Sequence, residues 1–196
     1  MSPAQPRHQV PDARSWEYAD GFVAPSPALQ EAREAARADQ WEVLSNGTTA
    51  LLAFLTRTMQ ASSVVTIGTD AGVSALALLE GMSDHGVLTS IDPDAERQAA
   101  ARKVLSLARI RSNQVRLITG TPLDVLPKLR DGAYDMVLIN GDRLEYVEYV
   151  SQALRLLRTG GIVVVNDALA NNHVADPDNE DDDTLIIRET LDSVLE

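Results

Sequence analysis

The chain has 196 residues, of which 44% are hydrophobic and 23% charged, enough for one globular domain with a full core. Its formal net charge of −12 argues against nucleic acid and anionic membranes as partners, because both attract basic surfaces. Cysteine is absent, which excludes disulfides and thiolate metal sites, and three histidines are too few for a histidine-rich metal site. Since no apolar run is long enough to cross a membrane and no signal peptide is evident, we expect a cytoplasmic protein.

Residues 1–15 contain three prolines and few apolar residues, so we predict a disordered tail there. A single domain is predicted over residues 16–196. Apolar residues at helical spacing predict a helix over Ala28–Leu44, which should lie outside the main sheet. A break at residues 45–47 separates it from a second helix, Thr48–Met59, which leads the chain into its first strand.

Beyond this point, apolar strands alternate with amphipathic helices. The predicted strands are Val64–Ile67, Val87–Ile91, Val115–Thr119, Tyr134–Asn140 and Ile162–Asn166. The predicted helices are one that opens at Val73, then Asp94–Leu107, Leu123–Leu129, Leu144–Leu157 and Leu185–Leu195. Strands that are apolar throughout are typical of sheets covered on both sides. The pattern predicts an α/β fold: a Rossmann-like, doubly wound, mostly parallel sheet with helices on both faces and accessory N-terminal helices.

A glycine turn links the first strand to the helix that opens at Val73. Such a turn builds the nucleotide pocket of open α/β sheets, and Gly68 and Gly72 let the backbone pass close to a ligand. Asp70 stands where the dinucleotide motif has its middle glycine, beside the pyrophosphate. A carboxylate would repel phosphates but tolerate a cationic ligand such as a sulfonium. The alternative is a tight turn that binds no ligand.

Polar residues follow the other strands as well. Asp92 ends the second strand, where an acid can accept hydrogen bonds from ribose hydroxyls, although it could instead cap the next helix. A polar cluster at the ends of the fourth and fifth strands could line a cleft or simply form turns. Its members are Asn140, Asp142, Asn166 and Asp167.

An acidic run over Asp176–Asp183 predicts a solvated loop. A calcium site in this run is disfavoured, because the ordered ligand spacing of an EF-hand loop is missing.

From about Trp16 to its end, the chain resembles class I S-adenosylmethionine-dependent methyltransferases. The likeness is to the small O-methyltransferases related to catechol and caffeoyl-CoA O-methyltransferases, bacterial members included. The segments that carry the resemblance are TIGTDAGVSALAL, GVLTSIDPD, VRLITGTPLDVLPKL, YDMVLINGD and LRTGGIVVVNDAL.

The resemblance implies S-adenosylmethionine as the cofactor. Asp92 would hold its ribose, Pro93 and Thr121 would lie beside its adenine, and Asn140 and Asp142 near its methionine end. The complete predicted set of cofactor-binding residues is Leu44, Thr66, Gly68, Thr69, Asp70, Gly72, Ser74, Asp92, Pro93, Thr121, Asn140 and Asp142.

The chain departs from this family at its metal and base positions. The three metal ligands of the family map to Asn140, Asn166 and Asp167, which leaves one carboxylate where two are expected, so Mg²⁺ binding is disfavoured. The general-base lysine maps to Arg143, which stays protonated and could instead stabilise a phenolate or hold an anionic substrate. Asp142 and Arg143 are the predicted catalytic residues.

There are two further departures from the family pattern. The family usually has glutamate where this chain has Thr66, and it follows its last helix with an antiparallel strand pair. Since the chain stops at Glu196, within or just after that helix, we expect either that this chain is truncated or that the protein lacks this strand pair.

The sequence thus predicts an O-methyltransferase that methylates a hydroxyl of a small molecule, with doubtful metal dependence, and the family implies a homodimer. One alternative is a catalytically impaired S-adenosylmethionine-binding protein with a regulatory or scaffold role. Another is a nucleotide- or NAD-binding oxidoreductase, against which Asp70 argues.

Overall fold

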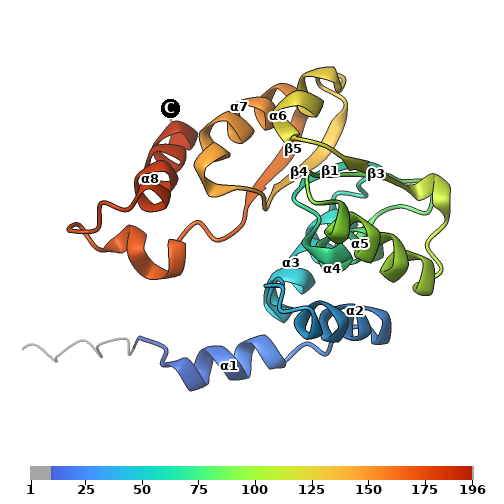
Figure 1. The fold of residues 1–196 in the computed structure, drawn as a ribbon, viewed down its shortest axis with the longest axis horizontal. Coiled ribbons are helices and arrows are strands. Elements are labelled where there is room, and N and C mark those ends of the chain that lie inside the picture. Colours follow the sequence, from blue (N-terminus) through green and yellow to red (C-terminus); the bar gives the residue numbers. More distant parts are fainter. Residues whose placement is uncertain (1–9, 196) are drawn as a thin grey trace, which may run out of the picture.

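The computed structural model describes residues 10–195 and shows a central sheet with helices on both faces (Figure 1). The sheet has five strands in the order β3-β2-β1-β4-β5, and each neighbouring pair is parallel. The strands are β1 (Ser63–Ile67), β2 (Val87–Asp92), β3 (Val115–Thr119), β4 (Tyr134–Ile139) and β5 (Leu157–Val165). This confirms the predicted α/β class and the doubly wound parallel sheet.

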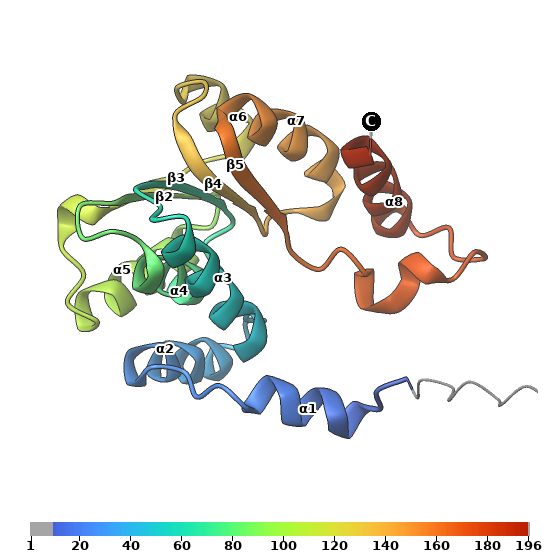
Figure 2. The ribbon, with the colours of Figure 1, turned by 180° about the vertical axis from the view of Figure 1, so that it is seen from behind.

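Successive side chains of each strand enter two different hydrophobic clusters. Val64 and Leu138 belong to the cluster shared with α2, α3, α4 and α5, whereas Val65 and Ile139 belong to the cluster shared with α7 and α8. The helices are α2 (Pro27–Ala38), α3 (Asn46–Thr58), α4 (Val73–Gly81), α5 (Ala95–Leu107), α6 (Pro122–Val125), α7 (Tyr146–Leu156) and α8 (Asp182–Leu195). Both views show these two sets on opposite sides of the sheet (Figures 1 and 2).

The strand order reverses between β1 and β4. From β1 the chain winds outward through β2 to β3, and it then returns to place β4 on the other side of β1. In open α/β sheets a ligand crevice is expected at such a reversal, beyond the carboxyl ends of the two strands. Short 3₁₀ turns lie in several of the connections: Asp70–Gly72, Ser112–Gln114, Leu126–Lys128, Arg143–Glu145 and Ala170–Ala175.

The N-terminal part differs from the tail predicted for residues 1–15. Its first nine residues lie outside the described residues, but a helix, α1 (Ala13–Gly21), occupies the end of the predicted tail. Asp12 starts this helix because its carboxylate accepts a hydrogen bond from the backbone N–H of Ser15 at 2.8 Å. None of the residues of α1 is buried, and both views show the helix away from the sheet (Figures 1 and 2).

The helix predicted over Ala28–Leu44 is shorter in the structure. It ends at Ala38 because Gln40 adopts a left-handed conformation, with φ of 59°, and the N–H of Trp41 donates to the carbonyl of Ala36. Glycine is the usual residue at such a helix end, so the sequence carried no signal for it. As predicted, α2 lies outside the sheet, since it packs on α4 and α5.

Residues 46 and 47 of the predicted break, and the glycine pair before the fifth predicted strand, are parts of regular elements. Asn46 and Gly47 form the first turn of α3, which Ser45 caps by accepting from the N–H of Thr48 at 3.1 Å. Gly160 and Gly161 lie within β5, which begins at Leu157, five residues before the predicted strand at Ile162.

Smaller differences concern the helices that follow the sheet strands. The predicted helix over Leu144–Leu157 consists of a 3₁₀ turn over Arg143–Glu145 and then α7. The acidic run is a loop only as far as Asp181, because α8 starts at Asp182. Within residues 10–195, no helix is both long and apolar enough to cross a membrane.

Gly81 provides a test of the packing between α3 and α4. A Cβ built on Gly81 would lie 2.1 Å from both the carbonyl oxygen of Ala53 and the Oγ1 of Thr56, so the two helices could not keep their separation. We expect Gly81→Ala to lower the free energy of unfolding by about 1–3 kcal/mol, the usual cost of overpacking a core. Urea denaturation followed by circular dichroism measures this change.

Gly21→Ala is the matched control, because a Cβ there would meet no atom within 4 Å. It should leave the unfolding free energy within about 0.5 kcal/mol of the original, or raise it slightly. Equal effects of the two substitutions would contradict the packing argument.

Candidate functional site

The crevice between β1 and β4 begins at Gly68. The N–H of Gly68 donates to the carbonyl of Ile91 in β2, and the N–H of Asn140 donates to the carbonyl of Ile67, both at 2.8 Å. Gly68 has φ of 89°, and a Cβ there would lie 2.1 Å from the carbonyl oxygen of Asn140. Only glycine therefore allows the turn after β1 to lie directly against the end of β4.

The turn that follows is held in an unusual backbone conformation. Asp70, Ala71 and Gly72 have φ values of 47°, 48° and 94°, three consecutive residues in the left-handed region. For residues other than glycine this conformation costs energy, and it persists only where the surroundings fix it. The loop is thus shaped by its contacts rather than by local preference.

Three hydroxyl side chains predicted to contact a cofactor brace this turn from inside. Thr66, Thr69 and Ser74 are all fully buried. The hydroxyl of Thr66 donates to the carbonyl of Gly68 at 2.9 Å, and that of Ser74 donates to the carbonyl of Thr69 at 3.3 Å. The Thr69 hydroxyl lies 2.9 Å from the hydroxyl of Ser90 in β2. Their side chains therefore hold the turn in its shape.

Asp92 lies beside the turn at the end of β2. One of its carboxylate oxygens accepts from the N–H of Thr69 and the other from the N–H of Asp94, each at 2.8 Å. A carboxylate offers about four lone-pair positions, so about two remain for a ligand's hydroxyls. Asp94, not Asp92, caps α5, because its carboxylate accepts from the N–H groups of Glu96 and Arg97. The alternative role of Asp92 as a helix cap is therefore wrong.

The residues predicted beside the adenine lie around Asp92. Pro93 directly follows it, and Thr121 immediately precedes α6; both are exposed. The N–H of Gly120 donates to the carbonyl of Asp92 at 3.0 Å, which brings the end of β3 close to the end of β2. The structure thus brings the predicted adenine and ribose residues to one edge of the sheet.

The polar cluster after β4 and β5 forms hydrogen bonds within itself. The side-chain N–H of Asn166 donates to the side-chain oxygen of Asn140 at 2.9 Å. Asp167 forms an ion pair with Arg143, which also binds the carboxylate of Asp183 at 3.2 Å. Side chains from two strand ends and from α8 therefore meet here.

This donor set does not fit a divalent metal. The amide oxygen of Asn140 already accepts a hydrogen bond, and the carboxylate of Asp167 is already neutralised by a guanidinium. Mg²⁺ prefers anionic oxygens. Over residues 10–195, no group of three or more histidine, cysteine, aspartate or glutamate side chains is arranged to hold a metal ion.

Arg143 stays fully charged in this setting. Its burial would lower its pKa, but hydrogen bonds and charge from Asp183 and Asp167 outweigh that effect and raise the pKa above its ordinary value. A permanent cation is thus fixed at the ends of β4 and β5. Asp142 lies next to it on the same turn, exposed, with one carboxylate oxygen accepting from the N–H of Leu144 at 3.1 Å.

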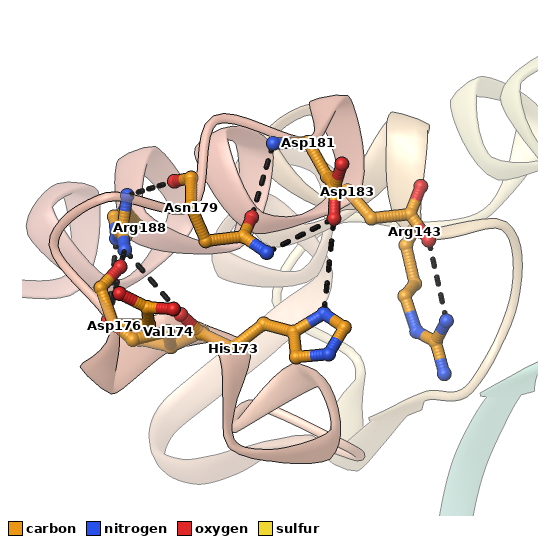
Figure 3. A network of polar contacts seen from close by, with 8 residues as sticks. All are labelled: Arg143, His173, Val174, Asp176, Asn179, Asp181, Asp183 and Arg188. Carbon is orange, nitrogen blue, oxygen red and sulfur yellow. Dashed lines mark hydrogen bonds and ion pairs between the residues drawn. The ribbon is translucent and has the colours of Figure 1, made fainter.

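A pocket of about 280 Å³ opens beside Arg143 and extends to the start of α8. Figure 3 shows its polar neighbours: Asp181 lies 3.9 Å from the Nδ1 of His173, and Arg188 ties the loop together through backbone carbonyls. The residues that line the pocket are Arg143, Ala170, Asn171, His173, Asp181, Asp182, Asp183 and Thr184. Carboxylates outnumber positive charges around this space.

A second pocket, of about 160 Å³, lies between α2 and α5. It is lined mainly by alanine and other apolar side chains, with Trp41 and Lys103 at its edge, and it shares only Ala71 with the glycine turn. None of the residues predicted to bind the cofactor lines this pocket.

Two features of the site escaped the sequence reasoning. One is Arg33, which is 5% exposed and donates to the carbonyl of Leu44. The only sign of this contact in the sequence was a charged residue on the apolar face of an alanine-rich helix. The contact between Arg143 and Asp183 joins segments 40 residues apart, and no spacing in the sequence announces it.

Comparison with known proteins gives a consistent result. Residues 22–195 match a family model described as O-methyltransferase. A Mycobacterium tuberculosis protein, Probable O-methyltransferase Rv1220c, is 36% identical over 181 residues, which cover 92% of this chain and 81% of that protein.

Two solved structures are similar over most of their length. The O-methyltransferase TomG from Streptomyces achromogenes, in complex with SAM, is 28% identical with a TM-score of 0.82, covering 92% of this chain and 82% of TomG. Cofactor-bound Rv0187 from MTB is 28% identical with a TM-score of 0.85, covering 96% of this chain and 87% of that protein.

Proposed function

Because this chain belongs to the O-methyltransferase family, we propose that it transfers a methyl group from S-adenosylmethionine to a hydroxyl of a small molecule without a divalent metal. The observation that carries the proposal is the hydrogen bond from the turn to Asp92, made at the edge where the strand order reverses. TomG, which shares the fold and 28% of the residues, was solved with SAM. None of the relatives named above supports a purely regulatory role.

The proposed cofactor contacts follow from this geometry. The free lone pairs of Asp92 would accept from the ribose hydroxyls, and Pro93 and Thr121 would hold the adenine. Leu44, Asn140 and Asp142 would hold the methionine end. The turn contributes its backbone at Gly68, Thr69, Asp70 and Gly72, while Thr66 and Ser74 hold that backbone in place.

The protein needs to supply little covalent chemistry. When bound, S-adenosylmethionine supplies a methyl group already activated on a sulfonium. Asp142 takes the proton of the acceptor hydroxyl, and Arg143 stabilises the negative oxygen that results. The methyl carbon would form its bond to the acceptor oxygen as its bond to the sulfur breaks, with the sulfur leaving as a neutral thioether, so the contribution expected of the protein is positioning and electrostatics.

Arg143 occupies the electrostatic role that a metal would have. It binds Asp167, the one carboxylate left among the three positions where the resemblance implies metal ligands. A fixed guanidinium next to the acceptor pocket supplies positive charge without the anionic ligand shell that Mg²⁺ requires.

The acceptor-side pocket favours neutral or cationic hydroxylated molecules. Asp181, Asp182 and Asp183 line it, and Arg143 is its one side chain with a permanent positive charge within the described residues. An acceptor that carries a carboxylate would be repelled, since charge interactions strengthen as water is excluded.

The cofactor assignment is tested with Asp92→Asn. An amide cannot accept from Thr69 and Asp94 on both of its atoms, and it loses the charge, so we expect the dissociation constant for S-adenosylmethionine to rise about 10- to 100-fold. Isothermal titration calorimetry measures it. The control is Asp84→Asn, because Asp84 is exposed and lies just before the start of β2, at the opposite end from Asp92. It should leave the dissociation constant unchanged. Binding of NAD in place of S-adenosylmethionine by the unaltered protein would refute the assignment.

Metal independence is tested by turnover of a catechol panel in excess EDTA. We expect the rates to be the same with and without EDTA. In Arg143→Ala, we expect kcat to fall about 100-fold or more, as it does when a donor that stabilises an oxyanion is removed. Arg102→Ala on exposed α5 surface is the matched control. Loss of activity in EDTA with recovery on addition of Mg²⁺ would refute the proposed metal independence. Tight cofactor binding without turnover of any acceptor would favour the regulatory alternative.

We further propose a homodimer in which a second copy covers α1. Trp16 and Tyr18 of this helix and Phe22 directly after it have exposed fractions of 65%, 73% and 73%, and the ring centroids of Tyr18 and Phe22 are 6.1 Å apart. Exposed aromatic groups of this kind mark interaction surfaces. A cytoplasmic location stays a prediction from the sequence.

Light scattering after gel filtration should give twice the 21.2 kDa mass of the chain. Replacing Trp16 and Phe22 together by serine should shift the protein to the single-chain mass. Leu154→Ser, which replaces an exposed apolar residue of α7 (59% exposed), should not cause this shift. A single-chain mass for the unaltered protein would disprove the dimer.

A further inference from the structure

Asp70 is a buried acid at the tip of the glycine turn. Only 7% of the residue is exposed, although a carboxylate is costly to bury without partners. Its carboxylate accepts from the backbone N–H of Leu44 at 3.3 Å. It therefore joins the turn after β1 to the segment between α2 and α3.

The same peptide segment is held from the other side. Arg33 of α2, itself 5% exposed, donates through its guanidinium to the carbonyl of Leu44. The N–H and the carbonyl of Leu44 are thus each bound by a buried charged side chain of opposite sign. No helix or strand holds this residue, because α2 ends at Ala38 and α3 begins at Asn46.

We propose that Asp70 is a positioning residue that, together with Arg33, clamps Leu44 against the glycine turn and so sets the affinity for the cofactor. The inference rests on the proposed function, in which Leu44 and the turn both contact S-adenosylmethionine. Asp70 acts through Leu44 and through the turn that it belongs to. Its side chain is directed at the peptide of Leu44 and not into the crevice.

The clamp should respond to pH. Burial raises the pKa of Asp70 to about 7, while the hydrogen bond from Leu44 and the charges of Arg33 and Arg97 act in the opposite direction. These two arginines, from α2 and α5, are the charged groups that act on it. The ionised carboxylate is the stronger acceptor, so the clamp tightens as pH rises through 7.

The effect on folding has the opposite sign. A carboxyl whose pKa is higher in the folded protein than in the unfolded chain favours folding when protonated. Its contribution to stability is therefore lost as pH rises from about 4 to about 7. Asp70→Asn, which stays neutral, should melt at a higher temperature than the unaltered protein at pH 8, even though it holds Leu44 less strongly.

The experiment compares dissociation constants for S-adenosylmethionine and S-adenosylhomocysteine at pH 6 and pH 8 by calorimetry. In the unaltered protein, affinity should rise severalfold between these pH values. Asp70→Asn should show a smaller rise, because only the ligand's own groups then titrate. Asp70→Ala, which removes the acceptor, should bind about tenfold more weakly at pH 8. Glu42→Gln removes an equal charge from the same segment at an exposed position and is the matched control.

Hydrogen exchange supplies a readout without any ligand. The amide of Leu44 should exchange faster in Asp70→Ala than in the unaltered protein, with no change in Glu42→Gln. If Asp70→Ala binds both ligands as tightly as the unaltered protein and the Leu44 amide exchanges at the same rate, the clamp is refuted. If the unaltered protein binds neither ligand, the proposed function fails, and the exchange rate still decides whether Asp70 holds Leu44.

Discussion

The close approach of Gly68 to the end of β4 is the constraint on which the site depends. The carbonyl of Asn140 lies where any Cβ of residue 68 would have to be, so β1 and β4 end against one another. From this contact the turn bends back, and the N–H of Thr69 reaches the carboxylate of Asp92 on β2. Three strand ends are thereby fixed in one small region. The arrangement of these strand ends depends on the backbone conformation of the turn. The hydroxyls of Thr66, Thr69 and Ser74 can therefore point into the protein while the turn keeps its position.

The sheet was predictable because each of its strands contains a cluster of apolar residues, which is continuous in β4 from Met136 to Ile139 and in β5 from Ile162 to Val165. Val64, Val65 and Ile67 are all fully buried, as strands covered on both faces must be. The helix ends were less accessible, since Gln40 adopts the left-handed conformation usually left to glycine, and Gly160 and Gly161 lie within a strand despite their usual role in turns. Tertiary contacts determine these backbone conformations and override the local propensities of the residues.

The residues of the candidate site likewise divide into those that the sequence predicted and those that it did not. Asp92 was predictable, because its place at a strand end follows from the order of strands alone. The partners of Arg143 and Asp70 were not, because each lies across the fold: Asp183 comes from the start of α8, and Leu44 from the segment between α2 and α3. Sequence reasoning identifies which groups reach the crevice edge. It does not identify which groups neutralise them, since that depends on how the loops return to the sheet.

The charges at the two ends of the crevice are arranged by one physical rule. A buried charge is retained only where an opposite charge or an oriented N–H group compensates it. At the acceptor end, Asp167 and Asp183 hold Arg143 charged, and that ion pair uses the carboxylate a metal would need. At the turn, Arg33 and the N–H of Leu44 only partly compensate Asp70, so its pKa is raised to about 7. One end therefore keeps a fixed cation over the whole physiological range, while the other can gain or lose a proton within it.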